Sequence, residues 1–162
     1  MNDIYKIKLF ASDVDGTLTD GGMYYTDQGE FMKKFNTRDA VGLRLLQEQD
    51  VHVALITGED SDIVRVRAKK LKIEHVYCGV TDKLKILHEL CVALNISTQQ
   101  VAYVGDDIND LEIIQNVGLS FAVSDAEPII LKSAMFKLEK SGGSGAVREA
   151  ANYVLELSLI HI

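Results

Sequence analysis

Short apolar runs alternate along the chain with longer segments in which apolar residues recur at helical spacing. The apolar runs predict strands at 7–11, 51–56, 75–77, 101–104 and 119–123, with a weaker one at 135–138. Helical spacing predicts a first helix capped by Asp39, and later helices at about 60–71, 83–94, about 110–117 and 146–157. Strands that alternate with helices this regularly predict an α/β fold with a doubly wound parallel sheet.

The stretch 20–35 departs from this alternation. Two short apolar segments flank Asp27-Gln28-Gly29, which predicts a β-hairpin inserted after the first strand. Its apolar side chains are too many for a hairpin that is freely solvated: Met23, Tyr24, Tyr25, Phe31 and Met32. We expect them to be buried against other copies of the chain. Packing on the hairpin's own domain is the alternative.

Polar residues stand where three of the predicted strands end. They are Asp13 with Asp15, Thr57 with Gly58, and Gly105 with Asp106 and Asp107. In sheets of this class ligands bind at the carboxyl ends of the strands, so we expect the three clusters to converge on one rim. Lys83 opens a predicted helix and would reach the same rim from its first turn.

This set of residues suits phosphoryl transfer through an aspartyl phosphate. A carboxylate attacks phosphorus only if the repulsion between the two anions is relieved, and Mg²⁺ bound by Asp13 and Asp106 would relieve it. Asp15 would act as general acid and base, while Lys83 and Thr57 would bind the phosphate oxygens. Taken singly, each has a plainer interpretation: a solvated Asp-x-Asp-Gly turn, a solvated lysine, and a threonine in a turn or cap.

Composition narrows the function class. The 162 residues suit a single domain over 1–162, and the net charge of −7 with a pI near 5.0 argues against nucleic acid or a membrane surface as partner. The N-terminus lacks a long apolar stretch, and no apolar run has the roughly 18 residues of a membrane span, so we expect a cytoplasmic enzyme. Cys78 and Cys91 lack a Cys-x-x-Cys partner, and neither zinc nor a disulfide is expected.

Four motifs in order resemble the haloacid dehalogenase superfamily of phosphohydrolases, and the match covers almost the whole chain. They are Asp13-Val-Asp15-Gly-Thr-Leu-Thr, Ile56-Thr57-Gly58, Lys83, and Gly105-Asp106-Asp107-Ile-Asn109-Asp110. The resemblance implies a nucleophile at Asp13, an acid/base at Asp15, and phosphate binding by Thr57, Gly58 and Lys83. It also implies Mg²⁺ held by Asp13, Asp106 and the backbone carbonyl of Asp15. Asp107 and Asp110 would be supporting residues, with a helix-capping role as the alternative for Asp110.

The spacing of the motifs leaves no room for a cap domain, so the chain looks like the capless group of this superfamily. Within that group it is similar to the phosphatases of 2-keto-3-deoxy sugar acids, of the 3-deoxy-D-manno-octulosonate 8-phosphate (KDO-8-phosphate) type. The segments that carry this are 20–22, 34–39, 101–107 and 142–149. The resemblance implies substrate contacts by Asn36, Arg38 and Arg148. It also implies a homotetramer in which the 20–35 hairpin helps to build an oligomeric barrel and a neighbour closes the site.

One departure bears on the substrate. The octulosonate phosphatases usually follow Thr-Gly with Arg, whereas this chain has Glu59, followed on the predicted helix by Arg67 and Lys70. That pattern looks closer to relatives acting on nine-carbon acids, such as 2-keto-3-deoxynononate or N-acylneuraminate (sialic acid) 9-phosphate. Glu59 would accept hydrogen bonds from a longer polyol, and Arg67 with Lys70 would hold a carboxylate. The nine-carbon acid therefore ranks level with KDO-8-phosphate or slightly ahead.

Two non-hydrolytic alternatives stay open. A phosphoacceptor signalling domain also combines a doubly wound sheet with clustered aspartates, but it places one phosphorylated Asp at a middle strand. A catalytically silent oligomerisation module would lose the nucleophile, and Asp13 is present.

Overall fold

The computed structural model describes residues 6–160, leaving out the side chain of residue 160, and is built on one parallel sheet with strand order β5-β4-β1-β6-β7-β8. The strands are β1 (Leu9–Ser12), β4 (His52–Ile56), β5 (His75–Tyr77), β6 (Val101–Gly105), β7 (Leu119–Ala122) and β8 (Phe136–Lys137). β1 lies between β4 and β6, and every residue in it is buried, because helices cover both faces of a parallel sheet. The predicted doubly wound α/β fold is confirmed.

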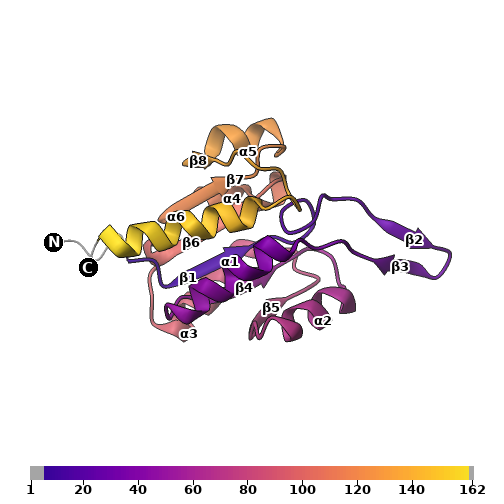
Figure 1. Ribbon diagram of the computed structural model, residues 1–162, viewed down its shortest axis with the longest axis horizontal. Helices are drawn as coiled ribbons and strands as arrows, with labels where there is room; N and C mark the ends of the chain where they lie inside the picture. The colour runs from indigo at the N-terminus through magenta and orange to yellow at the C-terminus, as the bar shows by residue number, and fades with distance from the viewer. Residues whose placement is uncertain (1–5, 161–162) are drawn as a thin grey trace.

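Within residues 6–160 six α-helices cover the sheet: α1 (Thr37–Glu48), α2 (Asp62–Lys70), α3 (Lys83–Leu94), α4 (Leu111–Ile114), α5 (Pro128–Ser133) and α6 (Ala146–Ile160). Figure 1 shows α1 and α6 side by side across the face of the sheet toward the viewer, where they pack on each other. Right-handed crossovers place α3, α4 and α5 on the opposite face, where α4 contacts both α3 and α5.

The start of α1 differs from the prediction. Asn36, not Asp39, caps the helix, since its side-chain oxygen accepts the N–H of Arg38 at 2.8 Å. Asp39 is buried in the first turn instead, and its carboxylate accepts the N–H of Arg148 at 2.9 Å near the start of α6. The predicted cap therefore joins α1 to α6, a contact between residues far apart in sequence.

The C-terminal half also differs in detail. The helix predicted at about 110–117 is a 3₁₀ turn, Ile108–Asp110, followed by the single turn of α4. The short helix α5, which begins at Pro128, was not predicted, because six residues carry too little periodicity to be recognised. The weak strand predicted at 135–138 is confirmed as the two residues of β8.

The predicted hairpin forms from β2 (Tyr24–Thr26) and β3 (Gly29–Met32), paired antiparallel and extending away from the sheet (Figure 1). Met23, Tyr25, Phe31 and Met32 are between 41% and 59% exposed. These side chains are therefore not buried on the hairpin's own domain. In the described residues neither gap between the motifs holds a separate cap domain. No helix of the described chain combines the length and apolar character needed to cross a membrane.

Candidate active site

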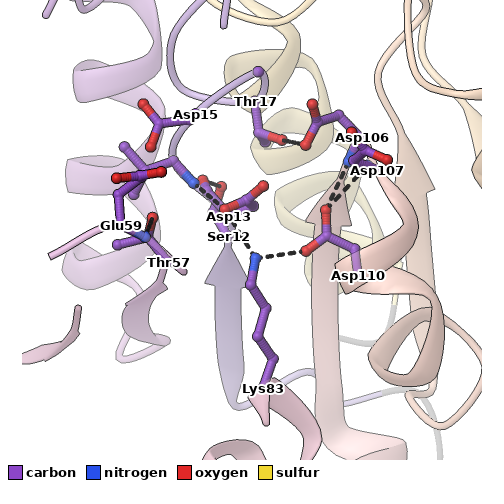
Figure 2. A network of polar contacts seen from close by, with 12 residues as sticks. Ser12, Asp13, Asp15, Thr17, Thr57, Glu59, Lys83, Asp106, Asp107 and Asp110 are labelled. Atoms are coloured by element: carbon purple, nitrogen blue, oxygen red, sulfur yellow. Dashed lines mark hydrogen bonds and ion pairs between the residues drawn. The ribbon is translucent and has the colours of Figure 1, made fainter. Parts of the chain in front are cut away.

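The strands β1, β4 and β6 end at the same level, and the polar clusters that follow them meet at one edge of the sheet (Figure 2). They line a cavity of about 200 Å³. Its lining residues are Asp13, Asp15, Thr57, Gly58, Glu59, Asp106, Asp107 and Asn109. The convergence predicted from the strand ends is thus observed, and it includes Asn109, which belongs to the fourth motif but had no predicted role.

Asp13 is buried at the end of β1 and pairs with Lys83. Its carboxylate lies 2.9 Å from the Lys83 ammonium and accepts the N–H of Val14 at 2.7 Å. Burial raises the pKa of Asp13 well above its usual value, and the charge of Asp110 adds to this, whereas Lys83 opposes it. Burial by itself would lower the pKa of Lys83, but the negative charges of Asp13 and Asp110 outweigh this effect, so the pKa of the lysine is raised.

Asp110 supports this pair from the turn after β6. One carboxylate oxygen accepts from the Lys83 ammonium at 2.8 Å and from the Tyr103 hydroxyl at 2.6 Å. The other accepts the N–H groups of Asp106 and Asp107 at 2.9 and 3.3 Å. Asp110 thus contacts Lys83 and also completes a capping box with Asp107, while its part as a supporting residue in catalysis stays a prediction. The fully buried hydroxyl of Tyr103 was missed, although a tyrosine in an apolar strand needs such a partner.

Carboxylate oxygens of Asp13, Asp106 and Asp110 lie within 4.8 Å of one another, and this arrangement fits a hard divalent cation. Asp110 is already engaged by four donors, which leaves Asp13 and Asp106 as the carboxylates for a metal. Burial is the main cause that raises the pKa of Asp106 to about 6. A Cβ on Gly16 would come within 1.9 Å of a carboxylate oxygen of Asp106, and the positive φ of Gly16 (84°) also favours glycine at this turn. The part of Asp15 as a ligand through its carbonyl stays a prediction.

Asp15 stands apart from this cluster and pairs with the hairpin. Its Oδ1 lies 2.5 Å from the ammonium of Lys33, which also lies 2.9 Å from Glu30. Burial opposes the charge of Lys33, but the hydrogen bonds to both carboxylates outweigh it, so the pKa of the lysine is raised. Sequence reasoning missed Lys33, because the charge pattern of the hairpin does not show which lysine is buried.

Thr57 and Gly58 lie at the end of β4, on the other side of Asp13. Thr57 is buried, and its hydroxyl accepts the N–H of Glu59 at 3.3 Å, as in a turn, while the residue lines the cavity. Glu59 is exposed at the mouth of the same cavity. The structure therefore brings Thr57, Gly58 and Glu59 to the predicted rim.

The other predicted specificity residues are not among those that line this cavity. Arg67 lies over the Phe35 ring, 5.4 Å from its centre, between α1 and α2, and Lys70 lies at the end of α2. Asn36 donates to the carbonyl of Gly143, and Arg148 donates to the carbonyl of Arg38. The contacts of Asn36 and Arg148 join α1 to α6 and to the glycine-rich segment 142–145. A role in substrate binding stays a prediction for all five residues: Asn36, Arg38, Arg67, Lys70 and Arg148.

We expect Asp106→Asn to stabilise the metal-free protein. The folded-state pKa of about 6 exceeds the ordinary 3.8, so this carboxyl contributes stability below about pH 4 that is lost as the pH rises through 6. At pH 7 in EDTA, urea denaturation should give the variant a free energy of unfolding about 1–3 kcal/mol higher than that of wild type. This difference between the two proteins should shrink toward pH 4.

Asp50→Asn is the matched control, because Asp50 is exposed and its left-handed backbone (φ 58°) accepts asparagine. It should leave stability unchanged within about 0.5 kcal/mol. An Asp106→Asn protein less stable than wild type in EDTA at pH 7 would contradict the expectation.

Comparison with known proteins agrees with the geometry. A family model described as haloacid dehalogenase-like hydrolase matches residues 62–149. The 3-deoxy-D-manno-octulosonate 8-phosphate phosphatase of Yersinia pestis is 45% identical over 149 residues, which span 92% of this chain and 80% of that protein.

Solved structures show the same likeness. The crystal structure of the Yersinia pestis phosphatase superimposes with a TM-score of 0.92 at 44% identity, covering 95% of this chain and 83% of its own. The corresponding phosphatase of Moraxella catarrhalis, in complex with magnesium, phosphate and KDO, superimposes with a TM-score of 0.91 at 37% identity. The match covers 99% of this chain and 98% of that one. This chain therefore belongs to the haloacid dehalogenase-like hydrolases, within the family of phosphatases that includes these two enzymes.

Proposed function

We propose that this protein hydrolyses KDO-8-phosphate to the free sugar acid and phosphate, with Mg²⁺ bound at Asp13 and Asp106. The observation that carries the proposal is the buried Asp13–Lys83 pair beside Asp106, with Asp13 and Asp106 both lining a cavity. The names of the relatives support the substrate, and the magnesium and KDO in the Moraxella structure support the metal and the sugar acid. A cytoplasmic location stays a prediction.

The residues divide the reaction into two steps. The Asp13 carboxylate attacks phosphorus and the ester P–O bond breaks, while Asp15 gives its proton to the departing sugar oxygen. Asp15 then takes a proton from water, which attacks the aspartyl phosphate, releases phosphate and restores Asp13. Lys83, Thr57 and Gly58 hold the phosphate oxygens throughout. When bound by Asp13 and Asp106, Mg²⁺ would supply positive charge that relieves the repulsion between the carboxylate and the phosphate.

The raised pKa of Asp13 explains why this site needs cations. A carboxylate attacks only in its ionised form, and burial together with Asp110 disfavours that form. Lys83 counters part of this effect from 2.9 Å. A divalent cation would counter the rest, so metal binding and activation of the nucleophile are coupled.

A nine-carbon acid 9-phosphate is the second candidate substrate. Glu59 lines the cavity and is exposed there, where a carboxylate accepts hydrogen bonds from the hydroxyl groups of a polyol. The reaction would be the same for both substrates, and the difference lies only in what Glu59 contacts.

We also propose that the hairpin 20–35 assembles the chain into a homotetramer. Its support is the exposure of four large apolar side chains on a segment that extends away from the sheet (Figure 1). A cluster of this kind on the surface is characteristic of an interface between subunits.

Asp13→Asn tests the nucleophile. Phosphate release from KDO-8-phosphate should require Mg²⁺, stop in EDTA, and fall at least about 10³-fold in the variant, because an amide cannot form the acyl phosphate. The variant should still unfold in one cooperative thermal transition, which shows that it is folded even if its midpoint shifts, and Asp50→Asn should keep its activity. Substantial turnover by Asp13→Asn would refute the assignment. Silence of the wild type with Mg²⁺ would favour a phosphoacceptor or non-catalytic module.

Glu59→Arg tests the substrate. The wild-type values of kcat/KM on KDO-8-phosphate, 2-keto-3-deoxynononate 9-phosphate and N-acetylneuraminate 9-phosphate establish the preference. The variant should shift it toward the eight-carbon ester by about 10-fold, since a hydrogen-bond acceptor for the longer polyol is replaced by a donor. Glu74→Arg, remote from this cavity, is the control. An unchanged ratio would remove Glu59 from specificity.

Phe31→Lys tests the hairpin. A charge at this position should prevent burial between subunits, so the variant should run as a smaller species than wild type in size-exclusion chromatography with light scattering. Val92→Lys is the matched control, because Val92 is also an exposed apolar residue but lies on α3. A wild-type protein that is monomeric at micromolar concentration would refute the assembly.

A further inference from the structure

Lys33 is a buried lysine that joins the hairpin to the catalytic loop. Its side chain is 1% exposed, although it follows directly after β3, and the neighbouring residues Met32 and Lys34 are exposed. Lysine is almost never buried without a partner, because its ammonium loses its hydration. Lys33 thus differs from its two exposed neighbours in the sequence.

The partners of Lys33 are two carboxylates from different parts of the chain. Asp15 Oδ1 lies 2.5 Å and Glu30 Oε1 lies 2.9 Å from the ammonium, and the two side chains are 20% and 14% exposed. Charged pairs in such partly desolvated positions hold each other more firmly than surface pairs do. Glu30, Lys33 and Asp15 therefore form a continuous chain of charge from the hairpin to the loop after β1.

The other oxygen of Asp15 has a different environment. Oδ2 is buried and has no hydrogen-bond partner among the described residues. A buried acceptor without a partner destabilises the protein, so such an atom marks a place where a ligand group or a proton completes the contact. Since Asp15 lines the cavity, a proton on Oδ2 could be donated there to the ester oxygen of the substrate, and after cleavage the new sugar hydroxyl could donate a hydrogen bond back to Oδ2.

We propose that Lys33 is a positioning residue for Asp15. It anchors the carboxylate through Oδ1, keeps it apart from Asp13 and Asp106, and leaves Oδ2 to exchange a proton with the departing sugar oxygen. Figure 2 shows Asp15 set away from the network formed by Asp13, Lys83 and Asp110. Glu30 holds Lys33 in turn. This inference rests on the proposed phosphatase activity and adds a residue that acts through Asp15.

The test compares two phosphate esters whose leaving groups differ in their need for a proton. The sugar alkoxide of KDO-8-phosphate must be protonated as it leaves, whereas p-nitrophenolate is stable without a proton. The value of kcat/KM reports the steps up to P–O cleavage for both. Lys33→Met should lower kcat/KM about 10- to 100-fold on KDO-8-phosphate, because it removes part of the effect of a general acid. On p-nitrophenyl phosphate the loss should be less than about threefold.

Three further variants make the result specific. Lys34→Met, the exposed neighbour, should match wild type on both esters. Lys33→Arg retains the charge and the donors, and it should restore most of the loss. Glu30→Gln should show the same dependence on leaving group with a smaller loss, which keeps the proposal testable if Lys33→Met does not fold. Equal losses on both esters, or no loss on either, would overturn the positioning role.

Failure of the proposed function has a separate signature. If the wild-type protein releases phosphate from p-nitrophenyl phosphate but not from KDO-8-phosphate, the proposed substrate is wrong. Glycerol 3-phosphate, which also has an alkoxide leaving group, then replaces KDO-8-phosphate in the comparison. Turnover of neither alkyl ester by the wild type overturns the positioning role as well. Wild-type activity on KDO-8-phosphate with unaffected Lys33 variants overturns the positioning role alone.

Discussion

The candidate active site depends on the charge balance around Lys83. Its ammonium lies between the carboxylates of Asp13 and Asp110, and all three side chains are buried. A buried charge without its partner destabilises a protein by several kcal/mol, so removing any one of them affects the other two. With Asp106 included, three carboxylates face one ammonium, which leaves a deficit of two positive charges when all are ionised. A divalent cation corrects this deficit, and metal binding thereby belongs to the stability of the site as well as to its chemistry.

Close backbone packing holds this charged cluster in place. Gly143 donates its N–H to the carbonyl of Thr17 at 3.1 Å, and a Cβ on Gly142 would come within 1.9 Å of the carbonyl of Gly16. The glycine-rich segment before α6 thus packs directly on the catalytic loop. Its sequence resembles a flexible linker, yet its contacts make it a support, because the absence of side chains allows the two backbones to touch. The site is preorganised in this way before any ligand binds.

The hairpin connects this chemistry to the surface of the molecule. Apolar side chains cover its outer part, whereas Lys33 at its base contacts Asp15. One short segment therefore carries both an exposed apolar surface and a contact to the carboxylate proposed as acid and base. Movement of the hairpin relative to the sheet would move that carboxylate, since the pair with Lys33 is the only hydrogen bond or ion pair of the Asp15 side chain among the described residues.

The sequence by itself determined the parallel sheet and its polar rim, because apolar periodicity and the residues that follow each strand are local features. It placed Asp13, Thr57 and Asp106 together, since parallel strands end at one edge. Only the tertiary structure decided which polar residues are buried and with whom. Asp39 serves α6 instead of capping α1, and Lys33 alone among the hairpin's charges reaches the catalytic loop. Such contacts join residues distant in the chain, and their free energy depends on burial that no local pattern records.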